Sequence, residues 1–150
     1  MHHLSRRRAT SLILVAAAAP LATALPSFAG APAPLAIGGY DPVAYFTTGA
    51  PARGLPELEY EWDEQRYRFA RPEHRAVFMA DPVRFAPQFA GFCAMSLTQG
   101  ELVDANPENW LIRDGKLYIF GKTVGPAVFD QDLAGNLVKA NEHRALVVKR

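Results

Sequence analysis

Two short apolar runs joined by Asp114-Gly115 constrain the fold of this chain more than any other feature. The runs at 110–113 and 116–120 read Trp-Leu-Ile-Arg and Lys-Leu-Tyr-Ile-Phe, and both are rich in residues that favour strands. Asp-Gly is a preferred dipeptide for the two-residue turn of a β-hairpin, because both turn positions need positive φ. The sequence therefore predicts an antiparallel hairpin over residues 110–120.

A second hairpin is predicted earlier in the chain, where polar and aromatic residues alternate. Residues 59–62 read Glu-Tyr-Glu-Trp and residues 66–69 read Arg-Tyr-Arg-Phe, with Asp63-Glu64-Gln65 between them. A period of two is typical of a strand with one buried face. We expect the aromatic side chains to be buried and the charged ones to pair across the outer face: Tyr60, Trp62, Tyr67 and Phe69 inside, Glu59, Glu61, Arg66 and Arg68 outside.

Short helices are predicted around these hairpins. Asp41-Pro42 predicts the start of a helix of about two turns that ends at Gly49, with the carboxylate capping free amides. Residues 71–80 predict a second helix, and Asp81 caps a third at 82–86. The residues of these helices that we expect to face the core are Val43, Tyr45, Phe46, Val77, Phe78, Val83 and Phe85.

The remaining segments complete the predicted fold. Residues 92–97 suit a strand or a helix, with helix favoured, and Asn-Pro-Glu-Asn at 106–109 predicts a turn or a single helical turn. From Pro126 onward, apolar residues at helical spacing predict one or two helices with a break near Gly135. Together these elements predict a small α+β domain with antiparallel β-hairpins packed against short helices.

The charge of the chain excludes one class of function. The sequence has 150 residues, with 16 Lys and Arg against 15 Asp and Glu, for a formal charge of +1. Residues 1–29 contain three arginines and no acidic residue, so the rest of the chain carries a small negative charge. Nucleic-acid-binding proteins concentrate positive charge, and we therefore expect no nucleic-acid partner.

Residues 1–29 have the organisation of a signal peptide. Arg6-Arg7-Arg8 precede an apolar run that begins at Leu12, and Ser27-Phe28-Ala29 places small residues where a signal peptidase needs them. Cleavage is therefore predicted after Ala29. The adjacent arginines favour a twin-arginine signal over a general secretory one. An uncleaved anchor is the less favoured alternative, because the run is short and interrupted at Pro20.

The predicted export sets the organisation and location of the mature protein. We expect a periplasmic or secreted protein with no stable membrane span after cleavage. Residues 30–36, which contain two prolines, predict a flexible leader, and the domain is expected at 37–148. Its single cysteine, Cys93, precludes an internal disulfide, so in an oxidising compartment this thiol is buried, reactive, metal-bound or paired with another molecule. Burial is the default for a free cysteine.

Several motifs resemble those of the YHS domain. The resemblance covers about residues 37–143 and is carried by 39–46 (Gly-Tyr-Asp-Pro-Val-Ala-Tyr-Phe), 66–69, Phe78, Asp81-Pro82, Phe85, 87–94, 110–112 and 114–118. It implies a small α+β domain with antiparallel strands, similar to exported stand-alone YHS proteins, and relatives that often occur beside metal-handling proteins. In metal-associated YHS and TRASH-type domains, cysteines follow the Asp-Pro-Val motif and flank the helix after the hairpin. The corresponding residues here are Ala44, Ala70 and His74, so only His74 keeps the character of a ligand.

The first functional hypothesis is a non-enzymatic domain that binds a soft metal ion, copper above others. Cys93 and Met95 offer sulfur ligands and His74 offers an imidazole. Residues at i and i+2 share a face on a strand but not on a helix. The predicted helix at 92–97 therefore conflicts with a Cys93–Met95 pair, and Cys93 with His74 is the better pair.

Two other classes of function stay open. A ligand- or protein-binding module with a structural Cys93 is the alternative, with Tyr40, Asp41 and Tyr45 as the candidate ligand-binding residues. An enzyme would need Cys93 and His74 as a thiolate–imidazole pair, with Asp41 or Asp104 as a third member. The sequence contains no nucleophile elbow, phosphate-binding loop, His-Glu-x-x-His or Cys-x-x-Cys motif, and we predict no catalysis.

Overall fold

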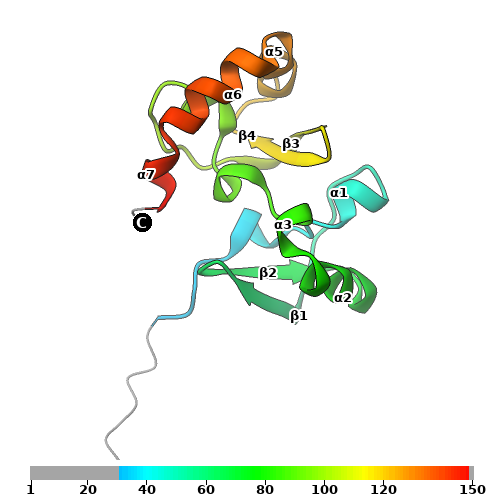
Figure 1. Ribbon diagram of the computed structural model, residues 1–150. Helices are drawn as coiled ribbons and strands as arrows, with labels where there is room; N and C mark the ends of the chain where they lie inside the picture. The colour runs from blue at the N-terminus through cyan, green and yellow to red at the C-terminus, as the bar shows by residue number, and fades with distance from the viewer. Residues whose placement is uncertain (1–30, 149–150) are drawn as a thin grey trace, which may run out of the picture. The chain divides into compact units, whose positions relative to one another are not determined.

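The computed structural model describes residues 31–148 (Figure 1). These residues lie within one compact unit, and the predicted signal peptide and predicted cleavage site lie outside the described residues. The described part is a small α+β arrangement of two antiparallel hairpins and short helices, as the sequence predicts. No helix among residues 31–148 is long and apolar enough to cross a membrane.

The first hairpin pairs β1 (Leu55–Trp62) with β2 (Gln65–Phe69). The predicted hairpin is confirmed, with Tyr60 opposite Tyr67 and Glu61 opposite Arg66, and β1 begins at Leu55, before the predicted run at 59–62. Tyr67 and Phe69 are buried, and Tyr60 and Trp62 pack partly buried against the same core. The carboxylate of Glu59 accepts hydrogen bonds from Arg66 and Arg68 on the outer face.

The segment before this hairpin is fastened to it. Ala33 and Pro34 belong to the region expected to be a flexible leader. Their carbonyls accept hydrogen bonds from the side chain and the backbone amide of Arg66, at 2.8 and 2.9 Å. A strand at the edge of a sheet has backbone amides without a partner in the sheet. Here the carbonyl of Pro34 accepts from such an amide. The next residues form the 3₁₀ turn η1 (Ala36–Gly39).

The second hairpin pairs β3 (Asn106–Arg113) with β4 (Lys116–Phe120) across the predicted Asp114-Gly115 turn. Both turn residues have positive φ, 52° and 69°. The turn or single helical turn predicted at 106–109 is wrong, because these residues begin β3. A register irregularity between Asn106 and Trp110 explains the error, since a bulge admits Pro107 into a strand.

Two consecutive helices follow the first hairpin: α2 (Pro72–Ala80) and α3 (Pro82–Phe85). The predicted cap is present, with Asp81 accepting from the amide of Arg84. Phe78 and Phe85 are buried, as predicted, but Val77 is 45% exposed and Val83 72% exposed. Successive helical residues point about 100° apart, so the face set by His74 and Phe78 turns Val77 to solvent.

The other helices are shorter or more numerous than predicted. α1 spans only Ala44–Thr47, and α4 (Ala94–Leu97) confirms a helix in the ambiguous 92–97 segment, after the 3₁₀ turn η2 (Gln88–Gly91). Three helices, not one or two, follow β4: α5 (Gly125–Gln131), α6 (Leu133–Glu142) and α7 (Arg144–Val148). The break lies at Asp132, which caps α6, because its carboxylate accepts from the amide of Gly135.

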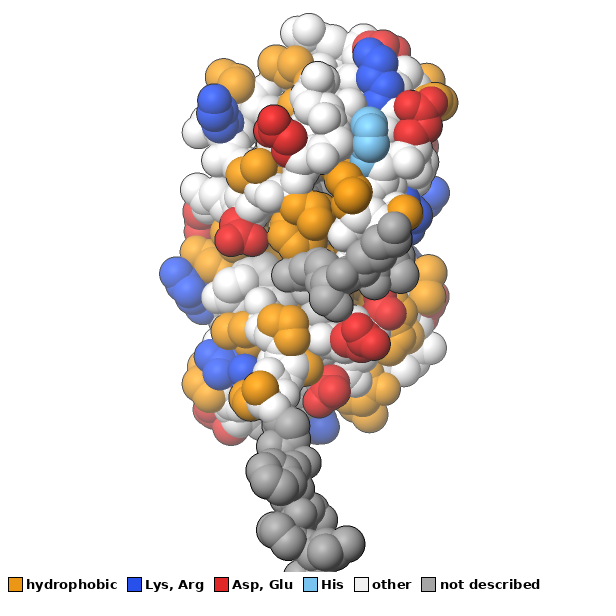
Figure 2. Space-filling model, turned by 90° about the vertical axis from the view of Figure 1, so that its left-hand side faces the viewer, with side chains coloured by type: hydrophobic (Ala, Val, Ile, Leu, Met, Phe, Trp, Pro, Cys, Tyr) orange, Lys and Arg blue, Asp and Glu red, His pale blue; other side chains and the backbone are white. Residues whose placement is uncertain are grey.

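Two groups of buried side chains hold these elements together. One lies around the first hairpin and includes Val43, Tyr45, Tyr67, Phe69 and Phe78, with Leu117 and Ile119 from β4. The other lies around α4 and the C-terminal helices and includes Cys93, Leu97, Phe120, Phe129 and Ala140. β4 contributes to both, so the two clusters meet along this strand. On the face shown in Figure 2, acidic and basic side chains are interspersed with hydrophobic ones.

Candidate functional site

A pocket of about 390 Å³ opens beside Cys93. Its walls come from α4, from the segment that leads into β3, and from the turn between β4 and α5. The lining residues are Cys93, Met95, Ser96, Gln99, Glu101, Val103, Asp104, Gly121, Lys122, Val124, Gly125 and Val128. The pocket thus brings the sole sulfur nucleophile of the chain together with carboxylates, an ammonium group and apolar side chains.

The backbone of Cys93 is held by contacts with two other segments of the chain. Its amide donates to the carbonyl of Val103 at 2.9 Å, and it forms a parallel bridge to Ile119 of β4. It is also the N-cap residue of α4, and its Sγ accepts a hydrogen bond from the amide of Ser96 at 3.5 Å. An N-cap side chain takes up an amide that the helix leaves free, and here the acceptor is sulfur.

Hydrogen-bond donors around this sulfur favour its charged form. Burial by itself raises the pKa of the Cys93 thiol, since desolvation disfavours a thiolate. The Ser96 hydroxyl and the backbone amides of Gly121, Ser96 and Met95 outweigh that effect, and the pKa of Cys93 lies below its ordinary value. The thiolate is the form that attacks electrophiles and binds metals. Cys93 is 5% exposed, and that exposed edge borders the pocket.

Met95 lines the same pocket as Cys93. The sequence indicated a conflict between a helix at 92–97 and a pair of sulfur ligands on one face. The structure removes it, because Cys93 precedes the helix with φ −59° and ψ 108°, and Met95 lies in the first turn. The i and i+2 rule for helix faces does not apply to a residue outside the helix.

The lining of the pocket combines exposed apolar side chains with charged ones. Val103 and Val128 are both 41% exposed, and Val124 is 64% exposed. Glu101, Asp104 and Lys122 line the pocket from the same segments. Exposed apolar side chains grouped around a concave surface are typical of a binding site.

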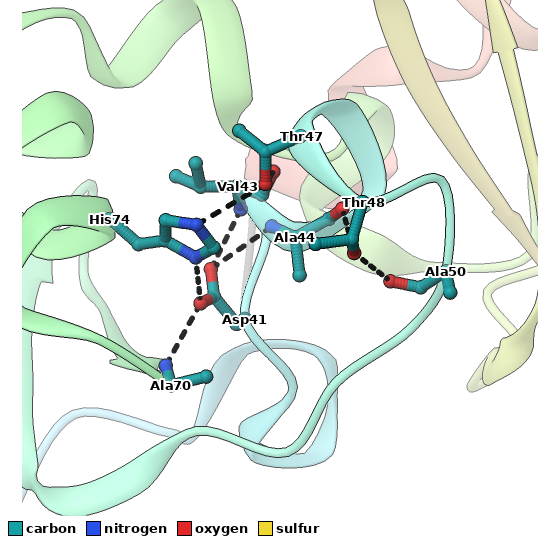
Figure 3. A network of polar contacts seen from close by, with 8 residues as sticks. All are labelled: Asp41, Val43, Ala44, Thr47, Thr48, Ala50, Ala70 and His74. Carbon is teal, nitrogen blue, oxygen red and sulfur yellow. Dashed lines mark hydrogen bonds and ion pairs between the residues drawn. The ribbon is translucent and has the colours of Figure 1, made fainter.

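A second polar cluster centres on Asp41 and His74 (Figure 3). Asp41 lies at the start of the α1 region and is 0% exposed, and His74 lies in the first turn of α2 and is 8% exposed. One carboxylate oxygen of Asp41 accepts from the amides of Val43 and Ala44, at 2.9 and 3.3 Å. The other accepts from the amide of Ala70 at 2.8 Å and contacts Nδ1 of His74 at 2.6 Å.

Both ring nitrogens of His74 have partners within this cluster. Nδ1 contacts Asp41, and Nε2 lies 3.2 Å from the hydroxyl oxygen of Thr47. His74 is not among the residues that line the Cys93 pocket. In the part of the chain that the structure describes, no group of three or more His, Cys, Asp or Glu side chains is arranged to hold a metal ion. The structure therefore brings Cys93 together with Met95, and His74 together with Asp41.

The three candidate ligand-binding residues at 40, 41 and 45 have partners inside the protein. The Tyr40 hydroxyl donates to Glu108 at 2.7 Å, and the guanidinium of Arg53 lies over its ring. Tyr45 is 1% exposed and donates to the carbonyl of Pro107 at 2.9 Å, and burial raises its pKa. Neither tyrosine nor Asp41 lines the Cys93 pocket.

Sequence reasoning singled out Cys93 and Met95 but missed the groups that tune them. Ser96 carries the one local signal, since a residue three positions after an N-cap presents its amide to the capping side chain. Gly121 and Lys122 reach the pocket only through the pairing of β4, which no local pattern reveals. Asp104 was named only as an alternative third member of a catalytic triad.

Comparisons with protein-family models, with curated proteins and with solved structures find no match to this chain.

Proposed function

We propose that this protein is an exported, YHS-like, non-enzymatic module that binds a soft metal ion, copper(I) above others, in the Cys93 pocket. One observation carries the proposal: Cys93 and Met95 line the same pocket, and the surrounding donors lower the pKa of the thiol. A thiolate and a thioether are the ligands that copper(I) prefers. A lowered pKa increases the fraction of deprotonated sulfur, which is the form that binds metals.

The donor set favours copper(I) over zinc. Structural zinc sites use four ligands, drawn from cysteine, histidine and carboxylates. The described pocket offers one thiolate and one thioether, and its carboxylates Glu101 and Asp104 are hard ligands that suit other ions better. Val103, Val124 and Val128 add apolar side chains to the lining of the same pocket.

His74 is left out of this proposed site. Its two nitrogens contact Asp41 and Thr47, so metal binding through His74 would break the contact with a fully buried carboxylate. A buried acceptor that loses a hydrogen-bond partner costs about 1–3 kcal/mol, and more when the acceptor is charged. The pairing of Cys93 with His74, which the sequence favoured, therefore receives no support from this geometry.

The second candidate function is binding of a small organic molecule at the same pocket, with Cys93 as a structural residue. A volume of about 390 Å³ lies within the range of small-molecule sites. Lys122, Glu101 and Asp104 supply both signs of charge, which suits a ligand that carries an anionic and a cationic group. Export from the cytoplasm, proposed from residues 1–29, is common to both functions.

A competition titration tests the metal proposal. The protein is purified after export, without a histidine tag, and copper(I) is partitioned between it and a coloured chelator. We expect Cys93→Ser and Met95→Leu each to lower copper(I) affinity by about tenfold or more, since even outer-shell changes cost 10–100-fold. Met79→Leu is the matched control, because Met79 is an exposed methionine on α2, away from the pocket.

The same titration separates the two candidate functions. If Cys93→Ser binds copper(I) as tightly as the parent, the metal proposal is wrong. X-ray absorption of the loaded protein should show sulfur scatterers, with one fewer in Met95→Leu. An organic ligand would instead be retained by Cys93→Ser and lost when Lys122→Ala removes the ammonium group.

A further inference from the structure

The two hairpins of the chain have the same length, the same kind of turn and the same irregularity. Each pairs a strand of eight residues with a strand of five, across a two-residue turn that begins with an aspartate of positive φ. The register is interrupted at the same place, between Leu55 and Glu59 in β1 and between Asn106 and Trp110 in β3. The second hairpin therefore repeats the first at a constant offset along the chain.

The hairpins belong to two larger units that also match, 37–80 (the first unit) and 89–131 (the second unit). Each unit begins with three consecutive residues of positive φ. The next residue but one, Asp41 in the first unit and Cys93 in the second, donates its amide to a carbonyl just before the hairpin, at 2.8 and 2.9 Å. The carboxylate of Asp41 and the sulfur of Cys93 each accept from the amide three residues on. Cys93 therefore corresponds to Asp41.

The helices that follow the hairpins complete the match. Phe78 of α2 packs against a tyrosine and a phenylalanine of β2, and Phe129 of α5 packs against the tyrosine and the phenylalanine at the same positions of β4. One helical turn before these phenylalanines lie His74 in the first unit and Gly125 in the second. A histidine in the first unit thus corresponds to a residue without a side chain in the second.

The corresponding spaces of the two units are filled differently. Beside Asp41, the ring of His74 places Nδ1 2.6 Å from the carboxylate and Nε2 3.2 Å from the hydroxyl oxygen of Thr47 (Figure 3). Beside Cys93 lies the pocket of about 390 Å³, and Gly125 is part of its wall. We propose that the Cys93 pocket takes up an imidazole group from outside the chain, in the place that corresponds to the ring of His74.

A side chain at position 125 does not fit in place of this group. A Cβ atom there would lie 2.7 Å from Cβ of Phe120, closer than Cβ atoms approach other atoms in proteins. Gly125 instead lets the start of α5 lie close against β4. The pocket is lined in part by Val124, which is 64% exposed, so it extends to the surface and a ring can enter from there.

The polar groups of the pocket suit the two nitrogens of an imidazole. A ring N–H can donate to the sulfur of Cys93, as the carboxylate of Asp41 takes up Nδ1 of His74 in the first unit. Gln99 also lines the pocket, and its amide can donate to or accept from the second nitrogen. Imidazole is also a copper ligand. Its role as the nitrogen ligand of copper(I) rests on the proposed function, whereas uptake of the ring by the metal-free pocket does not.

An NMR titration of the metal-free, ¹⁵N-labelled protein with 4-methylimidazole, the side chain of histidine, tests the uptake. The amide signals of Ser96 and Gly121 should shift and saturate at millimolar concentrations, because so small a ligand gains little binding energy. The corresponding amides of Ala44 and Ala70 should not shift, since His74 fills their space. 4-Methylthiazole, which has a similar shape but no N–H group, should bind about threefold or more weakly. If Ser96 and Gly121 do not shift, or if both compounds bind equally, the proposal is wrong.

His74→Ala is the matched control, because it opens the corresponding space in the first unit. In this variant 4-methylimidazole should also shift the amides of Ala44 and Ala70 and raise the Tm. Uptake of the ring by the first unit of the variant, without uptake by the second unit of the parent, would show that the two spaces are not equivalent and would overturn the proposal. If His74→Ala does not fold, the titration of the parent decides.

Two further arms identify the source of the imidazole and its link to copper. N-acetylhistidine methylamide should bind as 4-methylimidazole does if the group belongs to a peptide, and more weakly if it belongs to a small molecule. Saturating 4-methylimidazole should raise copper(I) affinity about fivefold or more, with the chelator calibrated in the same solution. If the parent binds no copper(I), the proposed function fails, and the metal-free titration still decides whether the pocket takes up an imidazole.

Discussion

Cys93 and the Asp41–His74 pair are both buried polar groups, but they differ in what surrounds them. Both oxygens of Asp41 accept hydrogen bonds from the protein, and both nitrogens of His74 have partners. Cys93 is surrounded by donors on one side and faces a pocket on the other. A polar group whose partners are all internal stabilises the fold, whereas one that also faces a cavity has room for a ligand.

The side chains around the two sites also differ. The Asp41 cluster lies beside the aromatic core, where Val43 is 0% exposed and Phe78 packs against Tyr67. The Cys93 pocket is bordered by exposed valines and charged side chains. Substitutions should therefore lower stability at the first site and change reactivity at the second.

Asp41→Asn is the substitution expected to have the largest effect. An amide at this position replaces one oxygen by an NH₂ group, which meets either the amide of Ala70 and Nδ1 of His74, or the amides of Val43 and Ala44. Either orientation places donor against donor. A buried donor or acceptor left without its hydrogen bond costs about 1–3 kcal/mol, and more when a charged group is involved. Urea denaturation at neutral pH measures the loss.

Asp104→Asn is the matched control for this comparison. Asp104 is an exposed aspartate that lines the Cys93 pocket. Surface substitutions away from buried networks change stability by about 0.5 kcal/mol or less. If Asp41→Asn were no more destabilising than Asp104→Asn, the buried cluster around Asp41 would not contribute more to stability than the lining of the Cys93 pocket does.

The sequence predicted the local half of the Asp41 site but not the distant half. Asp-Pro at 41–42 indicates a cap, because the carboxylate and the amides that it accepts are neighbours in the chain. The contacts with Ala70 and His74 span 29 and 33 residues and depend on how the first hairpin packs. The predicted burial of Val83 is wrong for a related reason. The sequence of a short apolar helix does not reveal which of its faces meets the core.

Ser96→Ala tests the surroundings of Cys93. We expect it to lower stability less than Asp41→Asn does. It removes the hydroxyl that lowers the pKa of Cys93 and keeps the amide that donates to Sγ. The pKa of the thiol should rise, so the fraction present as thiolate at neutral pH falls, and alkylation by iodoacetamide should slow several-fold. Loss of one hydrogen bond lowers stability by about 1 kcal/mol.

The pH profile of alkylation shows whether this change acts through the thiolate. In the parent, the rate should reach half its maximum below about pH 8.5, the ordinary value for cysteine. In Ser96→Ala the midpoint should move toward that value, while the rate at high pH stays the same. A lower plateau with an unchanged midpoint would instead indicate altered access to the pocket.

The pocket itself illustrates what the sequence does not reveal. Cys93 was recognisable as a candidate because it is the sole cysteine, and the hairpin at 110–120 was predicted from its Asp-Gly turn. What joins them is the bridge from Cys93 to Ile119, which places Gly121 against the sulfur. The pairing of an isolated residue with a strand 26 positions away leaves no periodic signal in either segment.

Gly121→Ala is the smallest change and tests access alone. A methyl group here would lie 3.7 Å from Sγ of Cys93 and 3.6 Å from the carbonyl oxygen of Asp104, which are ordinary contact distances. The amide that lowers the thiol pKa is retained, so stability should change by about 0.5 kcal/mol or less. The added methyl narrows the pocket beside the sulfur, so a bulky maleimide should be slowed more than iodoacetamide. An equal slowing of both reagents would indicate a change in the thiol pKa instead, and would contradict the prediction that reagents reach Cys93 through this pocket.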